Sequence, residues 1–107
     1  MTREDLKKIK VFQTRTIAEA CKRDVQTLAY VSDCLNRFYK GDYGEICDED
    51  TAANNTELDE GFGHVLARYK ARYNLESDIY IESHFDADMD ISELDYNNTM
   101  IMYCSER

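Results

Sequence analysis

The sequence of 107 residues contains no proline and only four glycines, at positions 41, 44, 61 and 63. With so few chain-breaking residues, no flexible linker or low-complexity tract divides the chain. It also lacks any run of about 18 apolar residues, which excludes a membrane-spanning segment. Met1–Leu6 carries charges with no apolar segment behind them, so no secretory signal is expected and a cytoplasmic location is predicted. The length and the 43% hydrophobic content predict a single domain, residues 1–107, with one core.

Cysteine is scarce and irregularly spaced. No C-x-x-C pair occurs, so a closed zinc site is not expected even when His64 and His84 are added as ligands. In a cytoplasmic protein the thiols are expected to stay free and to pack as small apolar residues. The four cysteines are Cys21, Cys34, Cys47 and Cys104.

One run imitates a calcium site. Residues 86–90, Asp-Ala-Asp-Met-Asp, have the alternating carboxylates of an EF-hand loop. Ile91 occupies the position where that loop needs glycine, and Asn97 occupies the position of its bidentate glutamate. We therefore expect a solvated loop between two strands, with no metal and no cofactor.

Sequence signatures of catalysis are also missing. There is no G-x-S-x-G elbow and no glycine-rich phosphate loop. The two histidines, His64 and His84, fall in expected strands with no orienting partner nearby in the sequence. Carboxylates are so abundant that no pair stands out as an acid and base. The sequence predicts a protein that is not an enzyme.

The charge is unevenly divided. Residues 1–40 hold nine Lys and Arg against five Asp and Glu, a net charge of +4, whereas residues 41–107 hold four against seventeen, a net charge of −13. The acids form two blocks without Lys or Arg, separated by the basic alternation Arg68, Lys70 and Arg72, which would share one face of a strand. The first block is Asp42, Glu45, Asp48, Glu49, Asp50, Glu57, Asp59 and Glu60. The second is Glu76, Asp78, Glu82, Asp86, Asp88, Asp90, Glu93 and Asp95.

The front part of the chain has helical periodicity. An apolar stripe recurs every three or four residues and predicts a core-facing helix that ends at Lys40-Gly41. Thr16 and Glu19 have the form of a capping box, so either one helix runs from 17 to 40 or it breaks near Arg23-Asp24. The stripe consists of Val25, Leu28, Val31, Leu35 and Phe38.

After Gly63 the apolar period changes to two. Strands are predicted over 64–70, 78–83 and 99–104, with a further strand before Thr14 and a shorter helix that begins at Asp48. The expected fold is a small single α+β domain, with a long helix packed on an antiparallel sheet of three to four strands. Exposed strand edges near Ile79 and Ile81, or Met100 and Met102, would allow a homodimer.

Three interpretations of the charge remain. The acid blocks could present carboxylates spaced like phosphates to the basic nucleic-acid channel of a protein partner. Alternatively, Arg15, Lys22, Arg23 and Arg37 of the basic N-terminal third could contact nucleic acid directly, as in a regulatory protein, although +4 is a thin charge for that role. The acids could also serve only solubility, in a non-catalytic homo-oligomeric module. The protein-binding residues predicted by the first interpretation are Asp48, Glu49, Asp50, Asp86, Asp88 and Asp90.

Several segments together resemble a known group of small proteins. The order Thr14–Glu19, Gly41–Glu45, Glu49-Asp50, Asn54 and Gly61, followed by sheet, resembles small uncharacterised proteins of phages, plasmids and integrated elements of Firmicutes. Their pattern is aromatic-Gly-Asp/Glu, then Glu-Asp-x-x-x-Asn. Residues 86–96 depart from it as an insertion, and Arg107 stands where an aromatic end is expected.

This resemblance implies a context. Small acidic proteins of mobile elements often block host defence, as anti-CRISPR and antirestriction proteins do. The partner expected by this analogy is a nuclease or a defence-complex subunit with a basic channel. Membrane binding is not expected, and direct nucleic-acid binding is disfavoured.

Overall fold

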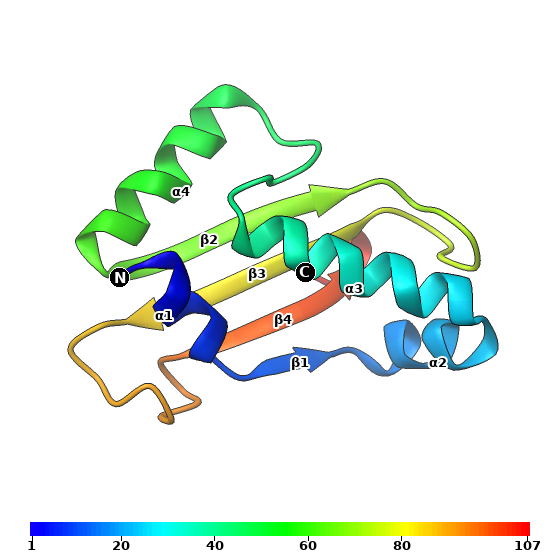
Figure 1. The fold of residues 1–107 in the computed structure, drawn as a ribbon, viewed down its shortest axis with the longest axis horizontal. Helices are drawn as coiled ribbons and strands as arrows, with labels where there is room; N and C mark the ends of the chain where they lie inside the picture. Colours follow the sequence, from blue (N-terminus) through cyan, green and yellow to red (C-terminus); the bar gives the residue numbers. More distant parts are fainter.

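The computed structural model describes residues 1–107 and contains one four-stranded sheet (Figure 1). Its strands are β1 (Val11–Gln13), β2 (Phe62–Tyr69), β3 (Ile79–Asp86) and β4 (Asn98–Tyr103), in the order β1-β4-β3-β2. The three long strands form the predicted antiparallel meander.

The sheet is mixed, which corrects the antiparallel sheet expected from the sequence. β1 pairs with β4 in parallel, with Phe12 opposite Met100. Alternation of apolar residues identifies a strand but carries no information about its direction. Because the partner of β1 lies more than 80 residues further along the chain, no hairpin turn constrains their orientation.

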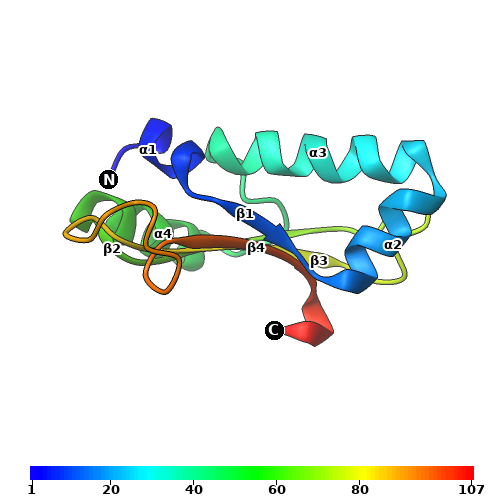
Figure 2. The same ribbon diagram turned by 90° about the horizontal axis from the view of Figure 1, so that it is seen from below.

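Three helices cover one face of the sheet. Figure 2 shows α1 (Arg3–Lys8), α2 (Arg15–Arg23) and α3 (Val25–Tyr39) on one side, with the C-terminal turn of residues 104–106 on the other. α4 (Asp48–Glu60) instead lies beside β2, at the edge of the sheet. No helix is both long and apolar enough to span a bilayer.

The chain breaks at Asp24, so no single helix runs from 17 to 40. Asp24 has extended backbone and caps α3, with one carboxylate oxygen accepting from the Gln26 N–H and the other from the Thr27 hydroxyl. The predicted capping box at Thr16 is wrong by two residues. Thr14 caps α2, and the Thr16 hydroxyl instead donates to Glu106 at 2.7 Å.

The core lies between α3 and the sheet. The buried face of α3 consists of Thr27, Val31, Cys34 and Phe38, which face buried β2 and β3 residues such as Val65 and Ile81. The predicted stripe is therefore only partly correct, because Val25 and Leu28 are 76% and 48% exposed and Leu35 is half-buried. Asp24 caps α3, and the face that the helix buries starts at Thr27, so Val25 in its first turn lies outside that face.

The cysteines differ in burial. Cys21 and Cys34 belong to the core, as predicted, whereas Cys104 is half-buried. Cys47 is exposed at the start of α4, which corrects the expectation that every thiol packs as an apolar residue.

The outer edge of β2 is closed by the chain between α3 and α4. Arg68 pairs through its N–H with the Tyr43 carbonyl and through its own carbonyl with the Glu45 N–H, at 3.1 and 2.7 Å. Gly44, at φ +70°, passes so close that a Cβ would collide with the Arg68 carbonyl. A peptide strand therefore cannot add at this point.

The strand edges that the sequence predicted for a homodimer are not edges of the sheet. Ile79 and Ile81 lie in β3, and Met100 and Met102 lie in β4, and both strands are inside the sheet with neighbours on each side. Their backbone groups already pair with β2, with each other or with β1. Edge-to-edge pairing through these residues is excluded.

Candidate functional site

The first predicted triplet forms the first turn of α4. Asp48, Glu49 and Asp50 are all exposed there. Their carboxylates lie at the positive end of the helix dipole, which stabilises the start of α4. None of the three has an ion-pair partner.

The second triplet shapes the β3–β4 loop. The Asp86 carboxylate accepts from the Asp88 N–H at 3.0 Å, and Asp90 accepts from both the N–H and the hydroxyl of Ser92. The hydrogen bonds from Ser92 lower the pKa of Asp90. Buried Asn97 holds the loop closed, because its side chain bonds the Asp86 N–H and the Asp90 carbonyl. No three His, Cys, Asp or Glu side chains are arranged to hold a metal ion.

The fold keeps the two triplets apart. The loop touches the end of α4, where the Ala87 N–H donates to the Gly61 carbonyl at 2.7 Å. Asp48–Asp50 lie at the other end of this 13-residue helix. At 1.5 Å per residue, α4 alone places about 20 Å between the first triplet and the Gly61 contact of the loop.

Charges elsewhere in the chain are largely paired. Glu4, Asp5 and Glu19 pair with bases on their own helices, Asp42 pairs with Arg37, and further pairs join the strands and the C-terminus. In contrast, no acid of the β3–β4 loop has a cationic partner, and α4 contributes only Glu57, which lies 3.9 Å from His64. The uncompensated negative charge is therefore concentrated on α4 and the β3–β4 loop.

The basic side chains predicted to contact nucleic acid directly are partly neutralised by ion pairs. Arg15 and Arg23 both pair with Glu19, and Arg37 makes two hydrogen bonds to Asp42. Lys22 is exposed on α2. These side chains do not form an unpaired cationic face, which a phosphate backbone requires.

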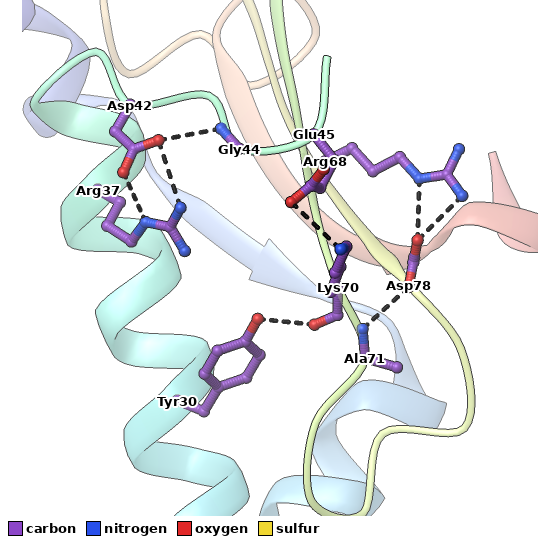
Figure 3. A network of polar contacts seen from close by, with 9 residues as sticks. All are labelled: Tyr30, Arg37, Asp42, Gly44, Glu45, Arg68, Lys70, Ala71 and Asp78. Atoms are coloured by element: carbon purple, nitrogen blue, oxygen red, sulfur yellow. Dashed lines mark hydrogen bonds and ion pairs between the residues drawn. The ribbon is translucent and has the colours of Figure 1, made fainter.

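The basic alternation at the end of β2 does not share one face. β2 ends at Tyr69, so only Arg68 belongs to the strand. Figure 3 shows Arg68 turned toward Asp78, while Lys70 lies on the side of Tyr30 and Glu45. The Arg68 hydrogen bonds and an N–H bond from Ala71 lower the pKa of Asp78, with the Ala71 bond the larger cause.

A charged cluster lies on the sheet face that the helices leave uncovered. The Glu82 side chain is only 7% exposed there, and it accepts from Arg107 at 2.9 Å and lies 3.3 Å from His84 Nε2. Burial by itself raises the pKa of Glu82, but the bonds and charge of Arg107 and the charges of His84 and His64 outweigh burial and lower it. The rings of His64 and His84, opposite each other across β2 and β3, are 5.7 Å apart.

Sequence reasoning missed this cluster. The period-two pattern of β2 and β3 places His64, Glu82 and His84 on one face once the register is known. Nothing in the neighbouring sequence predicts that the C-terminal Arg107 contacts Glu82 on that face.

Compared with protein-family models, curated proteins and solved structures, the chain matches none. Function is therefore inferred from the geometry and charge of the chain itself.

Proposed function

We propose that the protein is a non-catalytic inhibitor that binds a nucleic-acid-handling protein, with a host defence nuclease complex as the target class. The observation that carries the proposal is the uncompensated negative charge on α4 and the β3–β4 loop in a chain whose other charges are mostly paired. Such a surface complements a basic channel and speeds association with it.

The spacing of the two triplets supports mimicry of a phosphate backbone. The length of α4, about 20 Å, corresponds to about six phosphates along one strand of duplex DNA, so the two triplets are spaced by at least this part of a phosphate backbone. Because α4 is a helix and the loop is held by Asn97, the carboxylates are presented by ordered backbone. The resemblance to proteins of mobile elements points to the same target class.

Two further acids of α4 are placed against the preference of the helix. Asp59 and Glu60 lie in the last turn of α4, which contains no basic residue. Carboxylates at that end oppose the negative end of the helix dipole. Their presence is therefore not explained by the stability of α4, which favours a role in binding.

Capture of a partner from a Firmicute cell lysate tests the proposal with three triple variants. Two variants reverse Asp48, Glu49 and Asp50, or Asp86, Asp88 and Asp90, to Lys. The control reverses the dispersed acids Glu4, Asp33 and Glu76 and so changes the net charge equally. We expect capture to fall with either triplet reversal and to survive in the control. The loss should be greatest at low salt, because exposed charges are screened beyond about 10 Å at 0.1 M.

Competition by duplex DNA should release the captured partner if its basic channel is the contact. A partner that binds all three variants equally would contradict the proposal. A gel shift with duplex and single-stranded DNA tests the rival function, in which Arg15→Gln with Lys22→Gln and Arg23→Gln would abolish a shift given by the wild-type protein.

A further inference from the structure

Three cationic side chains line one pocket of this acidic protein. A pocket of about 200 Å³ lies between α3, the segment after α3 and the end of β2. Arg37 comes from the basic N-terminal third, whereas Lys70 and Arg72 are two of only four cations in residues 41–107. The lining is completed by Tyr30, Tyr69, Gly44 and Glu45.

The cations keep hydrogen-bond donors that no protein group uses. Arg37 spends two of its five N–H groups on Asp42, and Lys70 Nζ lies 3.9 Å from Glu45, beyond hydrogen-bond distance. Arg72 has no carboxylate partner, and its only polar contact is with the Tyr73 hydroxyl at 3.4 Å. Three cations against the carboxylates of Asp42 and Glu45 leave the pocket with a charge of +1, in a chain whose net charge is −9.

An aromatic surface adjoins the cations. The Arg72 guanidinium lies 5.3 Å from the Tyr30 ring centroid and 5.0 Å from that of Tyr73. The Tyr30 hydroxyl donates to the Lys70 carbonyl at 2.6 Å, which fixes its ring beside the pocket (Figure 3). Burial, as the main cause, raises the pKa of Tyr30 to about 12, so at neutral pH this residue adds no negative charge to the pocket.

Tyr73 is held in an unfavourable backbone conformation. Its φ of +55° is the only positive value outside glycine, and half of the residue is exposed. Bulky side chains avoid this region unless the surroundings impose it, and such residues concentrate at functional sites. The conformation keeps a flat ring in solvent next to an unpaired guanidinium.

We propose that this pocket binds a nucleotide, with the phosphate held by Arg37, Lys70 and Arg72 and the base stacked on Tyr73. Guanidinium and ammonium groups bind phosphate oxygens through charge-assisted hydrogen bonds, and aromatic rings stack bases without regard to sequence. At about 200 Å³ the pocket accommodates the phosphate and leaves the base outside, on the exposed ring. The ligand is either a free nucleotide or one nucleotide of a single strand.

Amide chemical shifts of the ¹⁵N-labelled protein test the proposal, with AMP, adenosine, inorganic phosphate and the RNA hexamer A6 as probes. We expect AMP to bind with roughly millimolar affinity and to shift amides near Tyr30, Gly44 and residues 70–74. Adenosine, which lacks the phosphate, should bind at least about tenfold more weakly. Tighter binding of A6 than of AMP would identify a strand as the source, and equal or weaker binding would identify the free nucleotide.

Three variants separate the roles. Arg72→Gln should weaken AMP binding about tenfold, because it removes an unpaired charge from the pocket. Tyr73→Ala should weaken AMP several-fold more than it weakens inorganic phosphate, because the ring stacks on the base and contacts the phosphate site only through Arg72. Arg15→Gln is the matched control, since that side chain is 92% exposed on α2, and it should change nothing.

Two results would overturn the proposal. One is the absence of localised shifts at about 10 mM AMP in low salt. The other is equal weakening by Arg72→Gln and Arg15→Gln, which would show diffuse attraction to positive charge. Because residues 72 and 73 are exposed, thermal unfolding should confirm that both pocket variants remain folded.

Discussion

α3 and α4 both flank the sheet, but different forces hold them. α3 packs Val31, Cys34 and Phe38 onto the covered face, so burial of apolar surface holds it in place. α4 buries only Asn54 and Leu58, and six of its thirteen residues are acidic. One helix therefore builds the core, and the other displays charge from the edge of β2.

The side-chain amide of Asn54 makes the two hydrogen bonds that a neighbouring strand would otherwise make to Leu66. Its Nδ2 donates to the Leu66 carbonyl at 2.8 Å, and its Oδ1 accepts from the Leu66 N–H at 3.0 Å. Both polar groups of an edge residue are thereby satisfied, although no strand lies beside it. The comparison shows that a helix can be fixed by a two-point polar contact while its outer face stays free for other use.

The largest expected effect concerns the apolar attachment of α3. Phe38→Ala should lower the free energy of unfolding by about 3–5 kcal/mol, because it leaves a cavity in the core. Chemical denaturation measures this loss. Leu28→Ala, on the 48% exposed flank of the same helix, is the control and should stay within about 0.5 kcal/mol of wild type. Similar losses at both positions would contradict the rotation of α3 described above.

The second-largest expected loss of stability concerns the contact between α4 and β2. Asn54→Ala should cost about 1–3 kcal/mol, because it leaves the Leu66 N–H and carbonyl without their partner in a partly buried position. Asn54→Asp should cost at least as much, since a carboxylate would then face the carbonyl oxygen. Asn36→Ala, exposed on α3, serves as the control in the same denaturation experiment. A neutral Asn54→Ala would show that Leu58 alone holds α4.

The uncovered face of the sheet differs from the covered face in that its contribution to stability should depend on pH, through Glu82. In the wild type the lowered pKa of Glu82 contributes stability that is present above the unfolded pKa, near 4.5, and is lost as pH falls through the lower folded pKa. In Arg107→Ala, burial is no longer offset by that guanidinium, so the pKa of Glu82 should rise and its contribution should decline above pH 4.5. The stability difference between the two proteins should therefore grow as pH rises.

Urea denaturation between pH 4 and 7 measures that difference, which we expect to reach about 1 kcal/mol, since the Arg107 side chain is 43% exposed. The same pair is also compared in a Glu82→Gln background, which removes the Glu82 carboxyl and keeps the neighbouring His64 and His84. A pH dependence that persists there would assign the effect to the histidines.

The smallest expected effect tests whether the acids of α4 serve stability. Glu60→Lys places a cation at the negative end of the helix dipole and should raise the free energy of unfolding by about 0.5 kcal/mol, with less gain at high salt. Thermal unfolding at two salt concentrations measures it. A loss of stability would indicate a structural role for Glu60 and would weaken the inference that these carboxylates are kept for binding.

Local patterns predicted most elements of the fold. The start of α4 at Asp48 and the end of α3 before Gly41 are confirmed, because capping and dipole preferences act within one turn. The three long strands are confirmed for the same reason, since alternation is a local property. The break at Asp24 was one of two alternatives, and it follows from a carboxylate able to cap the next helix.

The candidate sites were less predictable. Both acid triplets were found by counting charges, but their placement at opposite ends of α4 was not predicted, because it depends on which end of α4 meets the β3–β4 loop. The cationic pocket joins Arg37 to Arg72, residues from opposite ends of the charge division. The burial of Glu82 depends on Arg107, 25 residues away.

The sequence by itself determined the class of fold, the positions of most helices and strands, and the separation of basic and acidic halves, because propensity, periodicity and net charge are set by neighbouring residues. The tertiary structure alone decided the parallel pairing of β1, the face that α3 buries, the closure of β2 by Asn54 and the pairing state of each charge. These features arise from contacts between residues far apart in the chain, where direction and distance are set by packing and have no local signature.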